Sequence, residues 1–355
     1  MKKVMIAMSG GVDSSVAAYL LKKQGYECVG VMMRLHDELM AKQCPNKSVC
    51  GMDDIEDARA VADKLQIPFY ALDFSKEFDK QVIKHFVEAY ETGSTPNPCV
   101  DCNKYLKFGK LYEQAKEFGC DYIATGHYVR NIFNEETGRY ELHTSDDAGK
   151  DQTYVLYSLT QEQLAHSLFP LGEFDKEKIR AIAMEQGLIN ANKKDSEDIC
   201  FIPDGDYAAF LERYTGKSYM PGQFVHKDGT VLGEHKGLIR YTTGQRKGLG
   251  ISYKEPLYVL GKNLDTNTVT LGSNEDLFTT SCMATEVNWI MEKPTEPVMA
   301  EVCARYHAKR VRAKITPEEN DTIRVEFEQP VRAVTKGQAL VMYDGSKVLG
   351  GGTIG

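Results

Sequence analysis

The sequence contains no apolar run of about 18 residues, the length that a membrane-spanning helix needs, so it predicts no transmembrane segment. A secretory signal peptide is not expected either, because Lys2 and Lys3 precede only a short apolar stretch and Asp13 soon follows. Internal repeats and low-complexity segments are also absent from the sequence. We therefore expect a globular, cytoplasmic protein, and its 355 residues are enough for two or three domains.

The chain also lacks an excess of positive charge. Its formal net charge is −8, which gives no general attraction for nucleic acid, so an RNA partner would need a local basic surface. The nine cysteines do not form a regular framework, since their number is odd and they are scattered. In a reducing compartment they are expected to be thiols, metal ligands or catalytic groups rather than disulfides.

Short β-like runs alternate with amphipathic helical runs in the first half of the sequence. The pattern predicts strands at 2–8, 26–35, 68–74 and 122–126, and helices at 14–25, 54–66 and 80–93. Strands that alternate with helices indicate a parallel sheet covered on both faces. We expect this α/β parallel-sheet domain to occupy residues 1–204.

The pattern changes after the α/β region. Residues 224–235 and 258–272 read as hairpins with turn residues between alternating strands, and further short strands are predicted at 311–315, 322–328 and 339–345. We expect two small antiparallel β domains, roughly 205–278 and 279–355.

The stretch "MSGGVDSS", residues 8–15, lies where the first predicted strand turns into a helix. Glycines let the backbone approach an anion closely, and the free N–H groups of a first helical turn point toward it. The hydroxyls of Ser9, Ser14 and Ser15 add donors. The stretch predicts a phosphate site.

This loop has no lysine of the kind found in G-x-x-x-x-G-K-[ST] phosphate loops, which disfavours transfer of a terminal phosphate. It resembles instead the pyrophosphate loop of ATP pyrophosphatases, which split ATP between its α and β phosphates and attach AMP to an oxygen of the substrate. Asp13 could help to hold Mg²⁺, because that ion prefers hard oxygen ligands. A nucleophile that displaces AMP must come from elsewhere in the chain.

Two cysteines are candidates for that nucleophile. Cys102 is expected near a helix start, with Lys104 and Lys107 nearby, where the helix dipole and the positive charges lower the pKa of a thiol. Cys200 lies in a polar loop at the junction between the α/β domain and the β domains, and by itself it fits packing or function equally well. Four other cysteines are expected to be structural: Cys28, Cys120, Cys282 and Cys303. A zinc site formed by Cys44, Cys50, Cys99 and Cys102 is the alternative use of the loop cysteines.

Seven blocks in one order resemble the bacterial tRNA-specific 2-thiouridylase family of the ATP-pyrophosphatase superfamily. They are "MSGGVDSS", "TPNPCVDCNKYLKFG", "DYIATGHYVR", "GKDQTYVLYSL", "KKDSEDICFIPDGDY", "YTTGQRKGLGI" and "VLGGGTI". The resemblance implies an adenine-nucleotide α-hydrolase-like N-terminal domain. It also implies replacement of O2 of the wobble uridine by sulfur, with ATP, Mg²⁺ and tRNA, and with a sulfur-relay protein or cysteine desulfurase as the sulfur donor.

By motif match, the resemblance makes Cys200 the carrier of a persulfide and Cys102 its partner nucleophile, which would leave a Cys102–Cys200 disulfide to be reduced. Other roles are carried over by matching position. They assign ATP binding to Ala7, Met8, Ser9, Gly10, Gly11, Val12, Asp13, Ser14, Met33 and Gly126, target-base contact to Asn97, Pro98 and Cys99, and tRNA contact to His127, Lys150, Asp151, Gln152, Arg305, Tyr306 and Gln338.

The sequence departs from the family at Cys99, where members often carry aspartate, and Asp101 is a candidate substitute. The change also raises the alternative of an iron–sulfur cluster, [4Fe–4S], on Cys99, Cys102 and Cys200. Two basic stretches, residues 305–314 and 237–250, are suited to RNA contact. Two rival functions stay open from sequence: an amide-forming ligase of the same superfamily, and a non-catalytic RNA-binding protein that holds ATP.

Overall fold

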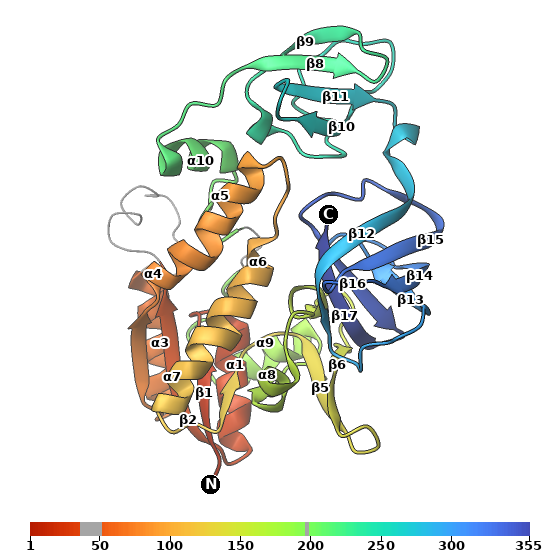
Figure 1. The fold of residues 1–355 in the computed structure, drawn as a ribbon. Helices are drawn as coiled ribbons and strands as arrows, with labels where there is room; N and C mark the ends of the chain where they lie inside the picture. The colour runs from red at the N-terminus through yellow and green to blue at the C-terminus, as the bar shows by residue number, and fades with distance from the viewer. Residues whose placement is uncertain (36–51, 196–198) are drawn as a thin grey trace.

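The computed structural model describes residues 1–35, 52–195 and 199–355 (Figure 1). The predicted parallel sheet is present, in the strand order β3-β2-β1-β4-β7. Its strands are β1 (Lys3–Ala7), β2 (Glu27–Arg34), β3 (Phe69–Asp73), β4 (Tyr122–Ala124) and β7 (Ser167–Leu168). The chain adds β2 and β3 on one side of β1 and then returns to place β4 on the other side. The loops that follow β1 and β4 therefore lie side by side at the carboxyl edge, where α/β sheets bind ligands.

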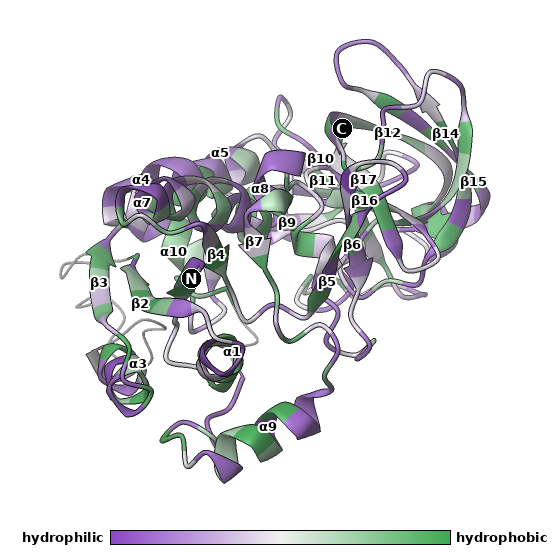
Figure 2. Cartoon of the chain, turned by 90° about the horizontal axis from the view of Figure 1, so that it is seen from below, coloured by the Kyte–Doolittle hydropathy of each residue, from purple (hydrophilic) through white to green (hydrophobic). Residues whose placement is uncertain are grey.

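Helices cover both faces of this sheet. Its helices are α1 (Val12–Lys23), α3 (Met52–Lys64), α4 (Ser75–Phe78), α5 (Lys84–Glu91), α6 (Pro98–Asp101), α7 (Leu111–Glu117), α8 (Gln161–Ala165) and α9 (Lys176–Glu185). Figure 2 shows α1, α3 and α9 on one face and α4, α5 and α7 on the other. Alternate residues of β1 face the two sides: Val4 and Ile6 pack in the cluster with α1 and α9, and Met5 packs in the cluster with α5 and α7.

Wide π-helical turns interrupt the helices on the α4, α5 and α7 face of the sheet. The segment Asp79–Ile83 joins α4 to α5, and the segment Cys102–Lys110 joins α6 to α7. Such widenings of a helix are frequent at functional sites. Cys102 is the first residue of the longer one.

The remaining chain forms two further sheets, and the predicted antiparallel pairs are present. The central sheet has the order β10-β11-β8-β9 and includes β8 (Gly222–His226), β9 (Val231–His235), β10 (Tyr258–Asn263) and β11 (Thr268–Gly272). The helix α10 (Tyr207–Thr215) precedes it. Short 3₁₀ turns lie at Thr153–Val155, Leu238–Arg240 and Glu275–Leu277.

The third sheet has eight strands in the order β12-β15-β14-β13-β16-β17-β6-β5, with a further pairing of β12 and β17. They are β5 (Val129–Asn134), β6 (Arg139–Thr144), β12 (Phe278–Trp289), β13 (Val298–Cys303), β14 (Val311–Pro317), β15 (Ile323–Arg332), β16 (Ala339–Asp344) and β17 (Lys347–Ile354). The hairpin β5–β6 was not predicted, and it joins this sheet through the pair Lys347 and His143 although it lies in the first half of the chain.

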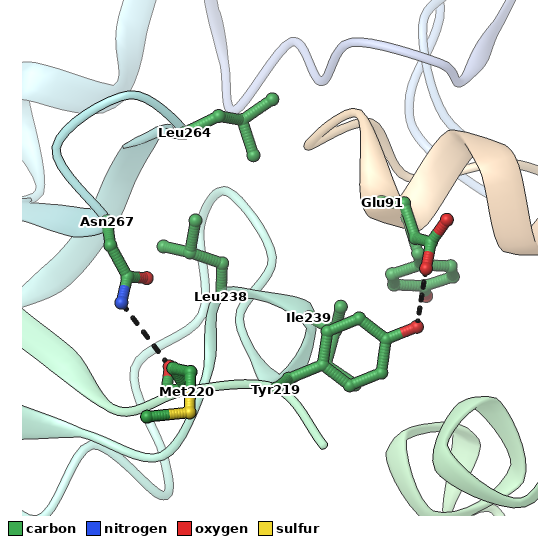
Figure 3. Close-up of a pocket in the computed structure, with 8 residues that line it drawn as sticks. Glu91, Tyr219, Met220, Leu238, Ile239, Leu264 and Asn267 are labelled. Atoms are coloured by element: carbon green, nitrogen blue, oxygen red, sulfur yellow. Dashed lines mark hydrogen bonds between the residues drawn. The ribbon is translucent and has the colours of Figure 1, made fainter. Parts of the chain in front are cut away.

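A pocket of about 340 Å³ separates the end of α5 from the central sheet (Figure 3). Glu91 accepts a 3.0 Å hydrogen bond from the Tyr219 hydroxyl at one side of it, and Leu238 and Leu264 line it from the central sheet. None of the residues that line this pocket is a predicted site residue.

Candidate nucleotide and thiol site

The loop after β1 has the form that the sequence predicts. Gly10 has φ +75, a conformation that favours glycine, and the extended Gly11 is the N-cap of α1 without any side-chain capping bond. The N–H groups of the first turn of α1 are therefore not capped by a side chain. The Ser14 hydroxyl accepts a 3.2 Å hydrogen bond from the Ser9 N–H and fixes the turn. This geometry suits a phosphate group.

Gly126 comes from the loop after β4 and lies against the same turn. A Cβ added at Gly126 would lie 2.8 Å from the nitrogen of Ser14 and 2.8 Å from the carbonyl carbon of Asp13, so only glycine fits here. Met33 is 9% exposed on the neighbouring β2. The structure thus brings the predicted ATP residues from three strand ends to one edge of the sheet.

The Asp13 carboxylate has strong partners that the sequence did not predict. Both its oxygens lie 2.8 Å from Lys176 Nζ, and Oδ1 also accepts a 2.6 Å hydrogen bond from the Tyr128 hydroxyl. Lys176 in turn lies 2.8 Å from Asp195. Asp195 also forms a 2.8 Å ion pair with Lys150, one of the residues predicted to contact tRNA.

The environment of Cys102 differs from the sequence prediction of a lowered pKa. Burial raises the pKa of the Cys102 thiol to about 11, and the positive charge of Lys107 opposes this only in part. Lys104 does not contribute, since its ammonium lies over the Tyr105 ring, 5.1 Å from the ring centroid. The prediction of a favoured thiolate was wrong because desolvation outweighs the nearby charge.

The segment before Cys102 is held by caps and by the third sheet. Asn97 accepts a 3.1 Å hydrogen bond from the Cys99 N–H as the N-cap of α6, and Pro98 is buried. Cys99 is exposed and lies near Tyr306, whose pKa is raised by burial and then by the negative charges of Asp151 and a Cys99 thiolate. The structure therefore groups a predicted target-base residue with two predicted tRNA residues.

The segments of Cys102 and Cys200 both pack on α5. His85 lies 3.8 Å from Asp101, beside Cys102, and the ring of the next residue, Phe86, contacts Phe201 with a centroid separation of 5.2 Å. Both cysteines are half-buried and pack against the same hydrophobic cluster. Adjacent residues of one helix thus hold the flanks of two cysteines that are far apart in sequence.

Several other predicted tRNA residues have structural partners. His127 is 7% exposed, with Nδ1 at 2.7 Å from the Thr125 hydroxyl, and burial lowers its pKa, followed by the effect of Lys107. Asp151 accepts a 2.6 Å hydrogen bond from Thr153. The remaining three are placed as follows: Gln152 accepts a 3.0 Å hydrogen bond from the Tyr128 N–H, Gln338 donates one to the Thr95 carbonyl, and Arg305 is exposed.

The four cysteines that were predicted to be structural are buried or half-buried. Cys28, Cys120 and Cys303 are buried, as predicted, and Cys282 is half-buried. Within residues 1–35, 52–195 and 199–355, no three His, Cys, Asp or Glu side chains are grouped as a metal site. Cys44 and Cys50, the other part of the zinc alternative, lie outside the described residues.

Known proteins match the chain along nearly its whole length. Residues 2–204 match the tRNA methyl transferase HUP domain, 208–273 the tRNA methyl transferase PRC-barrel domain and 279–354 the aminomethyltransferase beta-barrel domain. The tRNA-specific 2-thiouridylase MnmA of Clostridioides difficile is 49% identical over 99% of this chain and 98% of that protein. The same protein of Clostridium perfringens is 50% identical over 99% and 98%, and that of Clostridium acetobutylicum 49% over 99% of both. The chain belongs to the tRNA-specific 2-thiouridylase MnmA family.

Membership of the MnmA family agrees with the predicted fold class, a parallel α/β domain followed by antiparallel β structure. No helix of this MnmA-family chain, over the residues that the structure describes, is long and apolar enough to cross a bilayer. Lys176 and Tyr128 were missed as site residues. Nothing in the local sequence marks Lys176, whereas Tyr128 lies in the quoted block 121–130, directly after Gly126 and His127, and that position was the available signal. The Tyr128 ring also stacks below Lys176, with the ammonium 5.8 Å from its centroid.

Proposed function

We propose that this chain replaces O2 of the wobble uridine in tRNA by sulfur, in a reaction that consumes ATP. The observation that carries the proposal is the identity of about half of all residues with 2-thiouridylases over the full length of both chains. Because the match includes all three sheets, it supports the whole reaction rather than nucleotide binding alone.

The first step is activation of the uridine. The C2 oxygen attacks the α-phosphorus of ATP, an O–P bond forms, and the bond to the β-phosphate oxygen breaks, so that pyrophosphate leaves. The uncapped first turn of α1 with Gly10 and Gly11 supports this step, since it can hold the departing pyrophosphate. Mg²⁺ would enter with ATP, with most of its ligands from phosphate oxygens, and Asp13 would supply a carboxylate oxygen to it.

The second step is sulfur transfer. We expect Cys200 to carry the persulfide, Cys200–S–SH, which a donor protein supplies. The Cys102 thiolate attacks the Cys200 sulfur, a Cys102–Cys200 disulfide forms and HS⁻ leaves. HS⁻ adds to C2, and AMP departs with the former oxygen. A thiol reductant then returns the disulfide to two thiols with two electrons.

The packing of both cysteine segments on α5 supports this route, because the disulfide step needs the two thiols to meet. Cys99, Cys102 and Cys200 are not grouped as a metal site. We therefore assign Cys99 to the approach of the target base together with Asn97 and Pro98. The base must leave its stack to reach them, as in other base-modifying enzymes.

The proposal is tested with purified protein, ATP, Mg²⁺, a persulfide source and unmodified tRNA, followed by mass analysis of the nucleosides. We expect a uridine in which one oxygen is exchanged for sulfur. Cys102→Ala and Cys200→Ala should abolish the exchange, while Cys120→Ala, a buried cysteine of the α7–β4 connection, serves as the control.

Two other results would favour the rival functions. An amide-forming ligase should tolerate both cysteine changes, and an RNA-binding protein that only holds ATP should release no pyrophosphate when tRNA is added. Pyrophosphate release that depends on tRNA, together with the loss of sulfur exchange in the two variants, excludes both rivals.

A further inference from the structure

We propose that Lys176 binds the polyphosphate of the nucleotide and that Asp195 positions it. The inference rests on the proposed function only in taking ATP as the substrate at the loop after β1. The loop itself lacks a positive charge, and in this proposal the start of α9 supplies it.

The position of Lys176 is defined by its contacts. It is the first residue of α9, and its side chain is 12% exposed. Its ammonium lies 2.8 Å from each Asp13 oxygen and 2.8 Å from Asp195 Oδ1, so its N–H groups all face acceptors. Asp13 is the second residue of α1, so the ammonium lies at the turn whose N–H groups are uncapped.

Helix α9 is a firm support for this lysine. Ile179 and Ala183 of α9 are fully buried in the cluster that also contains Val16 and Ala17 of α1. Asp175 caps α9 by accepting a 2.7 Å hydrogen bond from the Lys178 N–H. Because the two helices pack together, the backbone of Lys176 is fixed beside the loop.

The charge of the ligand requires such a group. Pyrophosphate and the triphosphate of ATP carry several negative charges, whereas a helix N-terminus contributes only about half a positive charge. The sequence 9–15 supplies hydroxyls but no cation. A lysine ammonium acts as a point charge on phosphate oxygens, and Lys176 is within reach of any anion held by the first turn of α1.

Asp195 determines where that charge is held. Burial alone would raise the pKa of Asp195, but hydrogen bonds from Lys150 and Lys176 hold it below its ordinary value, so it stays ionised. Arg180 adds a third contact at 3.0 Å. Asp195 therefore keeps Lys176 beside the loop when phosphate oxygens compete with Asp13 for its N–H groups.

The alternative is that Lys176 only neutralises Asp13 as part of the fold. The two roles differ in what a substitution does to anion affinity. The roles are separated when Asp13 is itself neutral. In an Asp13→Asn background, a lysine that only neutralises Asp13 has no charge left to balance, so Lys176→Gln should leave the affinity of folded protein for pyrophosphate unaltered. A phosphate-binding lysine should still lower that affinity when it is removed.

The experiment measures binding of inorganic pyrophosphate and of Mg²⁺–ATP to the full chain by titration calorimetry, without tRNA or sulfur donor. We compare Lys176→Gln and Lys176→Arg with the control Lys178→Gln, each in an Asp13→Asn background. Lys178 belongs to the same helix, and its ammonium lies over the Phe174 ring at 5.0 Å from the centroid. We expect the pyrophosphate Kd to rise at least tenfold for Lys176→Gln, less for Lys176→Arg, and less than twofold for the control.

A folded Lys176→Gln variant in this background with a pyrophosphate Kd within twofold of the Asp13→Asn parent overturns the proposal. If that variant does not fold, Asp195→Asn provides the second arm, because it retains the lysine and removes its anchor. It should raise the Kd for pyrophosphate about threefold or more, and an unchanged Kd overturns the proposal as well. Since binding is measured without tRNA, either result stands apart from the test for sulfur exchange.

Discussion

Gln338 donates a 2.8 Å hydrogen bond from Nε2 to the carbonyl oxygen of Thr95. The reverse connection is made by the Thr95 N–H, which donates a 2.8 Å hydrogen bond to the Lys336 carbonyl. The turn before β16 is thus fixed to the loop that leads into Asn97 and Cys102. The third sheet therefore helps to hold the candidate base and thiol residues in place.

Substitution of Gly337 by alanine should disrupt this junction. Gly337 has φ +88, and an added Cβ would lie 2.9 Å from Ser94 Cβ and 3.0 Å from the Thr95 nitrogen. We expect a loss of about 2–4 kcal/mol in the free energy of unfolding, from a strained backbone and an overpacked contact. Sulfur exchange should fall more than the binding of Mg²⁺–ATP, because the displaced loop carries Asn97 rather than the phosphate turn.

Gly345→Ala is the matched control for the strain. Gly345 has φ +56 in the same sheet, but an added Cβ would meet nothing within 4 Å. This variant should lose only about 1 kcal/mol, the cost of a left-handed alanine, and keep its sulfur exchange. Equal losses of sulfur exchange in the two variants would show that the contact with residues 94–95 does not position the residues needed for exchange.

Asp101 should make the stability of the protein depend on pH. Burial raises its pKa from 3.8 to about 6, with His85 and Lys104 acting in the opposite direction and Glu286 in the same direction. Because the folded state holds the proton more tightly than the unfolded chain, the stabilisation by protonated Asp101 is complete below about pH 4 and is lost as the pH rises through about 6.

Asp101→Asn removes this dependence. We expect the variant to gain about 1–2 kcal/mol in unfolding free energy over wild type at pH 7.5 and about a third of that at pH 4.5, as measured by denaturant unfolding at both values. The side chain is 25% exposed, which reduces the effect below that of a fully buried group. Glu113→Gln on the exposed face of α7 is the control, and a gain that is the same at both pH values would contradict the expectation.

The sequence allowed the phosphate turn to be predicted because all its determinants are local. A buried apolar strand, two glycines and a helix start define it within 13 residues, Lys3 to Ser15, and the structure has these elements in place. The family resemblance implied that Gly126 binds ATP, and the adjacency of β1 and β4 explains why it lies beside the phosphate turn. The geometry of that contact follows from packing that no local pattern encodes.

The partner of Asp13 could not be predicted in the same way. Lys176 is 163 positions from Asp13, and it looks like an ordinary surface lysine at the start of an amphipathic helix. The pKa of Cys102 was predicted in the wrong direction for a related reason. The sequence shows the lysines near the thiol, whereas the burial that dominates depends on the cluster assembled from several helices.

Gly126→Ala should weaken nucleotide binding and also lower stability, because the added Cβ meets backbone atoms rather than a flexible side chain. The added Cβ would press on the backbone of Asp13 and Ser14, so the phosphate turn must shift by several tenths of an ångström. We expect the Kd for Mg²⁺–ATP to rise at least tenfold in titration calorimetry. Gly261→Ala, where a Cβ would meet nothing within 4 Å, is the control, and equal affinities in the two variants would refute the close approach.

The reactivity of Cys102 should rise steeply with pH and depend on one lysine. With its pKa raised to about 11 by burial, only about one thiol in a thousand is ionised at pH 8, since each pH unit changes the ratio tenfold. Alkylation of Cys102 by iodoacetamide, followed by peptide mass spectrometry, should therefore accelerate about tenfold per pH unit between pH 7 and pH 10.

Lys107 supplies the positive charge that acts on Cys102, and Lys107→Gln should raise the pKa of the thiol further and slow alkylation at pH 9 several-fold. Lys104→Gln is the matched control, because Lys104 lies on the same helical segment but is directed at the Tyr105 ring. A rate that is flat between pH 7 and pH 9, or equal slowing in both variants, would mean that Cys102 is ionised by some other group. The proposed attack on the persulfide needs the thiolate, so Lys107→Gln should also slow sulfur exchange at neutral pH, where little of the thiol is ionised.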